Sequence, residues 1–113
     1  MAESLTLRAV VFEDRGRLVA QCLESDLCTS ARDRQELRRK LTAQLRLQIT
    51  LDLEKGWKPL ASLPRAPQRF WEMYARSSAP EEVLSIRGSW LDLLFRALRR
   101  RSGVQAKLTL ATA

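Results

Sequence analysis

The chain contains no histidine, and this absence removes the most common tools of protein catalysis. Without histidine it cannot form a Ser-His-Asp triad, a Cys-His nucleophile pair or a mixed Cys/His zinc site. The carboxylates near the ends of the first two strands, Glu13, Asp14, Glu24 and Asp26, have no identifiable partner that would fit them for acid–base work. The sequence therefore predicts a protein that is not an enzyme and that needs no cofactor and no metal.

Cysteines and long apolar runs are also scarce. The two cysteines, Cys22 and Cys28, are too few for a disulfide framework, and the alternating run around Cys22 favours a buried free thiol. No segment approaches the roughly 18 consecutive apolar residues of a transmembrane helix. The first residues lack the basic and apolar regions of a signal peptide, so we expect a cytoplasmic protein.

The chain does have enough apolar sequence for a folded core. Of its 113 residues, 45% are hydrophobic and 29% are charged, which is typical of a globular domain. The net charge of +7 is unevenly distributed. Residues 1–56 contain ten Lys or Arg and nine Asp or Glu, whereas residues 57–113 contain ten and four. The basic character therefore belongs mainly to the second half of the chain.

Alternating apolar residues predict two strands near the start of the chain. The alternation covers residues 5–12 and again residues 17–23, and a polar turn that ends at Gly16 joins the two runs. Two such runs with a short polar connection predict a β-hairpin. Residues 27–29 fit either a third strand or an extended edge.

A long helix is expected to follow these strands. Asp33 and Glu36 have the spacing of a capping box, and Gly56 is suited to end the helix. A leucine or isoleucine recurs at every fourth position from Leu37 to Leu53; Leu47 and Leu51 supplement this stripe, and Arg39, Lys40 and Asp52 are among the charged residues expected on the outer face. We therefore expect an α+β fold with a small antiparallel sheet, made of the hairpin plus the third strand, and one long helix on one face.

The second half begins with a proline-rich connector over residues 57–66. Its apolar residues Trp57, Leu60 and Leu63 are expected to hold it against the sheet or the helix. Pro67 is suited to open a second, short helix that runs to about Ser77.

The remaining residues are expected to form a basic helical extension. Residues 81–87 fit either a helix or a short strand, and residues 90–101 have the pattern of an amphipathic helix. Residues 106–112 fit either a terminal strand that returns to the hairpin or a frayed tail. These patterns divide the chain into a β-β-β-α domain (residues 1–56), a connector (57–66) and an extension (67–113).

The first half resembles the N-terminal domain of the HicB antitoxin family over residues 5–58. The features that carry the resemblance are the acidic-glycine hairpin turn, the second strand after it, the Asp26-Leu27-x-Thr29 element and the start of the helix at Asp33-x-x-Glu36-Leu37. The resemblance implies a hairpin, a third strand and a helix packed across one face of the sheet. It also implies binding to a HicA-type toxin, a small basic ribonuclease, and in many members self-association and DNA binding through the C-terminal part.

Candidate binding residues lie in the expected helix over residues 90–101. Its polar side contains four arginines that could neutralise phosphates of DNA or RNA: Arg96, Arg99, Arg100 and Arg101. Its apolar side could pair with another helix or a protein partner through Trp90, Leu91, Leu94, Phe95 and Leu98. A solvated helix end or an amphipathic helix on an anionic membrane would have the same pattern.

Two functions remain open at this point. One is a non-catalytic HicB-like antitoxin or orphan regulator that binds a protein partner through its sheet and helix, and that is expected to form homo-oligomers. The other is a nucleic-acid-binding or scaffold subunit of a larger assembly that acts through the basic C-terminal helix.

Overall fold

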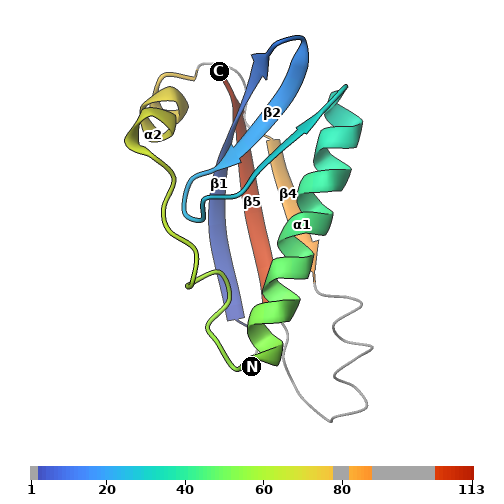
Figure 1. Ribbon diagram of the computed structural model, residues 1–113, viewed down its shortest axis with the longest axis vertical. Helices are drawn as coiled ribbons and strands as arrows, with labels where there is room; N and C mark the ends of the chain where they lie inside the picture. The colour runs from blue at the N-terminus through green and yellow to red at the C-terminus, as the bar shows by residue number, and fades with distance from the viewer. Residues whose placement is uncertain (1–2, 78–81, 88–103) are drawn as a thin grey trace.

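A computed structural model of the chain describes residues 3–77, 82–87 and 104–113 (Figure 1). In chain order the elements are β1 (Glu3–Asp14), β2 (Arg17–Cys22), β3 (Cys28–Ala31), α1 (Arg34–Glu54), α2 (Gln68–Ala75), β4 (Glu82–Arg87) and β5 (Val104–Thr112). The strands form one five-stranded sheet in the order β3-β2-β1-β5-β4. Strand β1 pairs with β5 in parallel, and the other neighbours pair antiparallel, so the sheet is mixed.

The expected fold class is wrong in its sheet and in its C-terminal part. The sheet has five strands instead of three, and the parts of the expected helical extension that the structure describes beyond residue 77 are strands β4 and β5. Strand β5 lies between β1 and β4, where Leu7 is opposite Leu108 and Ala9 is opposite Leu110. Of the two alternatives for residues 106–112, the terminal strand that returns to the hairpin is therefore the correct one. Its parallel pairing with β1 and its place inside the sheet join residues about 100 positions apart, so no local periodicity indicates them.

The predicted hairpin is present, and its turn explains its sequence. Asp14 pairs with Arg17, which leaves Arg15 and Gly16 as the two loop residues. Their φ angles are 53° and 78°. Positive φ at both central positions is typical of a type I′ turn, whose twist matches that of the two strands it connects.

Helix α1 begins and ends where the sequence predicts. The Asp33 carboxylate accepts a hydrogen bond from the Glu36 N–H at 2.8 Å, and Gly56 follows the helix with a φ of 74°. The four-residue stripe packs against the sheet through buried side chains: Leu37, Leu41, Leu45 and Ile49. They form the main core together with inward residues of the strands, among them Leu7, Ala9, Val11, Ala20, Cys22, Leu108 and Leu110.

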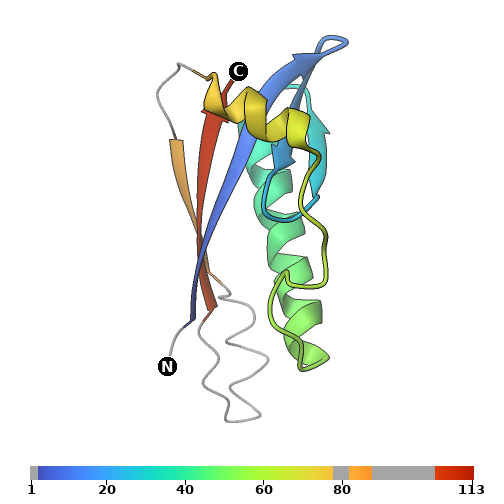
Figure 2. The same ribbon diagram turned by 90° about the vertical axis from the view of Figure 1, so that its left-hand side faces the viewer.

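The opposite face of the sheet is covered in part by α2, which lies near the end of the chain marked C (Figure 2). Val10, Leu23 and Ala66 are buried there, and the rings of Phe12 and Phe70 stack with centroids 5.9 Å apart. Both faces of β1 are therefore packed at this end of the sheet, which is why Val10 and Val11 are both buried.

The connector after α1 follows the prediction except at Trp57. Leu60 is buried, and Leu63 packs against the main core. Trp57 is 50% exposed, so it does not hold the connector in place. That role belongs to Asp52, which was expected on the outer face of α1 but is only 1% exposed because the connector folds back over it.

Candidate protein-binding surface on helix α1

Helix α1 presents an apolar ridge to solvent on the side opposite the sheet. The ridge follows the same four-residue spacing as the buried stripe and consists of Arg39, Ala43, Leu47, Leu51 and Lys55. Because rows of residues four apart slant around a helix, the inner and outer rows turn together and stay on opposite sides. The outer row therefore remains in solvent along the whole helix, with Leu47 53% exposed and Leu51 41% exposed.

The apolar surface continues past the end of the helix. The Lys55 ammonium lies over the Trp57 ring, 4.6 Å from its centroid, and Trp57 is itself half-exposed. Single exposed apolar side chains are common on protein surfaces, but adjacent ones in a row are typical of a surface that contacts another protein.

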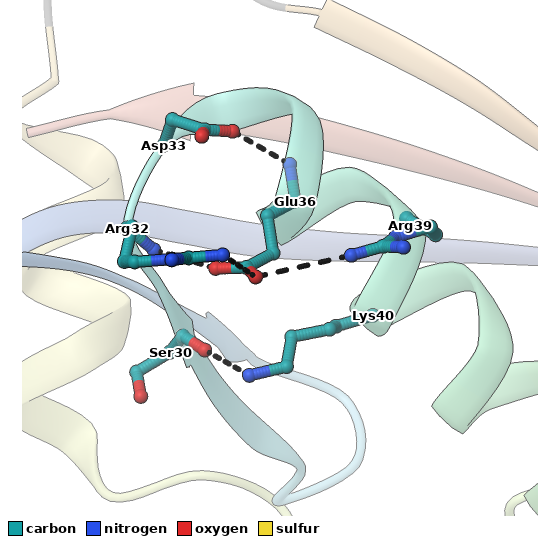
Figure 3. A network of polar contacts seen from close by, with 6 residues as sticks. All are labelled: Ser30, Arg32, Asp33, Glu36, Arg39 and Lys40. Carbon is teal, nitrogen blue, oxygen red and sulfur yellow. Dashed lines mark hydrogen bonds and ion pairs between the residues drawn. The ribbon is translucent and has the colours of Figure 1, made fainter.

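The N-terminal end of the same face is a cluster of charged side chains (Figure 3). The Glu36 carboxylate accepts hydrogen bonds from the Arg32 N–H at 2.8 Å and from the Arg32 guanidinium at 3.2 Å. The Arg39 guanidinium lies 3.8 Å from the same carboxylate. The hydrogen bonds from Arg32 are the main reason that the pKa of Glu36 is lowered to about 2.

The carboxylates of this cluster are occupied by contacts within the chain, whereas its cations remain accessible. The side chains of Arg32 and Arg39 are exposed, and they line a shallow cavity of about 260 Å³ together with Asp33, Gln35 and Glu36. Asp33 caps the helix, and the single carboxylate of Glu36 is shared by Arg32, Arg39 and Lys40, so the cluster keeps an excess of positive charge. The cluster can therefore contact carboxylates of a partner.

Lys40 also covers the free edge of the sheet at β3. Its ammonium donates a hydrogen bond to the Ser30 carbonyl at 2.9 Å (Figure 3). Strand β3 is an edge strand of only four residues, and a lysine at such an edge opposes pairing with a further strand. This edge of the sheet is thus protected, and the accessible apolar surface on this side belongs to α1.

A second shallow cavity lies beside α2, on the other side of the sheet. It has a volume of about 420 Å³ and is lined by Arg69, Glu72, Met73, Arg76 and Ala113. Arg76 is 3.7 Å from Glu72, so part of its charge is balanced within the helix. No apolar row accompanies this cavity in the described part of the chain, and we base the candidate site on α1.

The binding residues predicted from the sequence all lie outside the described residues. This applies to the expected phosphate contacts Arg96, Arg99, Arg100 and Arg101 and to the expected interface residues Trp90, Leu91, Leu94, Phe95 and Leu98. Sequence reasoning assigned Leu47 and Leu51 to the buried stripe of α1, and this interpretation is wrong. Their four-residue spacing to Ala43 and to the charged Arg39 and Lys55 was the signal that places them on the outer row.

The described residues contain no group of three or more His, Cys, Asp or Glu side chains that could hold a metal ion. In the same ranges, no helix is long and apolar enough to cross a membrane. Comparison with family models, with curated proteins and with solved structures finds no match to this chain.

Proposed function

We propose that this chain is a non-catalytic regulator of the HicB-like kind that binds a protein partner through the outer face of α1. The observation that carries the proposal is the row of Ala43, Leu47 and Leu51 in solvent, next to the basic cluster of Arg32, Arg39 and Lys40. An exposed apolar row bordered by charged residues has the composition of a protein interface, in which apolar contacts supply affinity and the charged rim supplies orientation.

The order of elements over residues 3–54 adds support from the resemblance. Strands β1, β2 and β3 followed by α1 are the order that the resemblance to HicB antitoxins implies. One fold can serve many functions, so the element order alone does not identify a partner. The surface chemistry does narrow the choice, because it requires a partner with an apolar patch and adjacent carboxylates.

The test is co-expression with the proteins encoded beside this chain, followed by co-purification and by inhibition assays if a neighbour is a toxic ribonuclease. Leu47→Glu places a charge in the apolar row and should abolish the complex. Val83→Glu is the matched control, because Val83 is 56% exposed on β4, a different part of the surface. Failure of every neighbour to bind, or equal loss of binding in both variants, would contradict the proposal.

A second experiment distinguishes protein binding from nucleic-acid binding. Duplex DNA and RNA are titrated against the purified chain at two salt concentrations, because neutralised phosphates give a binding constant that falls steeply with salt. The present proposal is wrong if three results are obtained together: nucleic acid binds with this salt dependence, the Leu47→Glu variant binds it equally well, and no neighbouring protein binds. The chain would then act on nucleic acid.

A further inference from the structure

Most of the basic residues of α1 lie at the end that the dipole of the helix disfavours, although Glu36 in the first turn and Lys55 at the C-cap follow the dipole. The first two turns contain Arg34, Arg38, Arg39 and Lys40, whereas the last turn contains no basic residue. A helix has partial positive charge at its N-terminal end and partial negative charge at its C-terminal end, so its own dipole favours the opposite arrangement. Arg34 and Arg38 are balanced by Glu82 of β4, at 3.1 and 2.9 Å. Lys40 forms no ion pair with a described residue, and the nearby carboxylate of Glu36 that attracts it is already bound by Arg32.

The C-terminal half of the same face offers the complementary charge. Glu54 is exposed and forms no ion pair with any described residue. It lies seven residues after Leu47, and Lys40 lies seven residues before it. At 1.5 Å per residue, the two charges are therefore about 10 Å from Leu47 in opposite directions along the helix.

We propose that the outer face of α1 binds a second copy of this chain, with the two α1 helices antiparallel about a two-fold axis at Leu47. In this arrangement Leu47 contacts its equivalent, and Lys40 lies level with Glu54 of the second copy. The small side chain of Ala43 lies opposite Leu51 of the second copy, so a large residue fills the space left by a small one at both ends of the contact. The basic start of each helix lies beside the C-terminal end of the other, which the dipoles favour.

The two cations of the outer row each have a contact within their own chain. Arg39 is 3.8 Å from Glu36, and Lys55 lies over the Trp57 ring. Lys40 can keep its bond to the Ser30 carbonyl, because an ammonium has three donors. A self-complementary patch of this kind is what a closed two-fold dimer requires.

This inference rests on the proposed function in that both use the outer face of α1. It adds that the face is occupied by a second copy when no other partner is present, so that partner binding requires the dimer to dissociate. The contact consists of one helical row from each copy, and we expect a dissociation constant on the order of 10 μM for such a small interface.

The test is sedimentation equilibrium of the full chain alone, from about 1 μM to about 1 mM. The wild-type chain should pass from monomer to dimer. Leu47→Glu should raise the dissociation constant more than about tenfold, and Val83→Glu should leave it unchanged. Circular dichroism of each variant checks that the fold is intact.

A charge exchange tests the antiparallel register itself. Glu54→Lys should weaken the dimer because it faces Lys40 of the second copy, and Lys40→Glu should do the same by facing Glu54. The two changes together restore opposite charges at both ends and should recover most of the affinity. A parallel pair would bring Lys40 next to Lys40 and gain nothing from the exchange.

The outcomes distinguish the two proposals. A chain that stays monomeric up to 1 mM, or a dimer broken by Val83→Glu and not by Leu47→Glu, overturns the self-association. If the chain is monomeric but binds a neighbouring protein, and Leu47→Glu abolishes that binding, the self-association is wrong and the proposed function is supported. If the chain forms a dimer that Leu47→Glu disrupts, but no neighbouring protein binds, the self-association is supported and the proposed function is wrong.

Discussion

The buried carboxylate of Asp52 accepts a hydrogen bond from the backbone N–H of Leu60 at 2.7 Å, and this bond fixes the chain reversal after α1. Gln48 donates to the other carboxylate oxygen at 3.1 Å, and the Asp52 carbonyl accepts from the Trp57 N–H. Leu60 has a φ of 64°, a conformation that leucine rarely adopts, and it is buried in the main core. The bond to Asp52 is therefore one reason that this strained position is stable.

Asp52→Ala should destabilise the protein by about 2 kcal/mol, because it leaves the Leu60 N–H buried without an acceptor. Asp52→Asn keeps one acceptor oxygen and should cost less than the alanine variant. Urea unfolding at neutral pH measures both values. If both variants lower the free energy of unfolding equally, the hydrogen bond from the Leu60 N–H to the side-chain oxygen at position 52 does not stabilise the protein.

The hairpin turn should respond in opposite directions to two substitutions. Gly16→Ala should cost about 1 kcal/mol, because alanine is disfavoured at a φ of 78°. An added Cβ would meet no atom within 4 Å, so the cost reflects backbone conformation alone. Arg15→Asn should stabilise by a few tenths of a kcal/mol, because asparagine tolerates positive φ better than arginine.

Thermal unfolding measures both hairpin variants, with Arg17→Ala in the adjoining strand as the control. If Gly16→Ala is no more harmful than Arg17→Ala, the turn is not held in the type I′ conformation.

Stability should decrease in acid because of Glu36. Its pKa is lowered from 4.5 to about 2 in the folded protein, chiefly by hydrogen bonds from Arg32. A carboxyl with a lowered folded-state pKa stabilises fully above its unfolded value, so this contribution is lost as the pH falls from about 4.5 towards 2. Glu36→Gln should be less stable than the wild type at pH 7, and the difference should shrink in acid.

Urea unfolding at pH 7 and at about pH 3 checks this prediction. Glu13→Gln serves as the control, because Glu13 forms no ion pair with any described residue. If the difference in free energy of unfolding between the wild type and Glu36→Gln is the same at both pH values, the prediction is wrong.

The two cysteines should react very differently with a thiol reagent. Cys22 is buried, and burial raises its pKa to about 12, whereas Cys28 is exposed on β3. The folded protein should therefore be labelled once, at Cys28. Partial burial raises the pKa of that thiol as well, and its labelling should speed up as the pH rises because the thiolate is the reactive form. Cys28→Ser should remain unlabelled until urea unfolds it, as mass spectrometry can measure. Labelling of the folded Cys28→Ser variant would mean that Cys22 is accessible.

The features that sequence reasoning predicted correctly depend on neighbouring residues. The hairpin depends on alternation and on a turn at Arg15 and Gly16, and the start of α1 depends on the Asp33 bond to the Glu36 N–H. Even here one detail differed. The Glu36 side chain binds the N–H of Arg32, one residue before the capping residue, instead of that of Asp33.

The features that sequence reasoning missed depend on contacts between distant parts of the chain. For residues 81–87 the local pattern leaves both a helix and a short strand open, and pairing with β5 makes residues 82–87 a strand. Asp52 has the spacing of a surface residue, and it is buried only because the connector returns to it. Leu47 and Leu51 looked like core residues because hydrophobicity alone does not say which of two parallel rows faces the sheet.

Composition and local periodicity are sufficient to establish that the chain lacks histidine chemistry, that it contains a hairpin followed by a capped helix, and that its positive charge lies mainly in its second half. These properties follow from composition and from periods of two and about four residues, which are local. Long-range packing, in contrast, sets the position of β5 beside β1 and leaves an apolar row of α1 in solvent. Both depend on which surfaces meet when the chain closes, and that choice is made by the summed packing of residues far apart in the sequence.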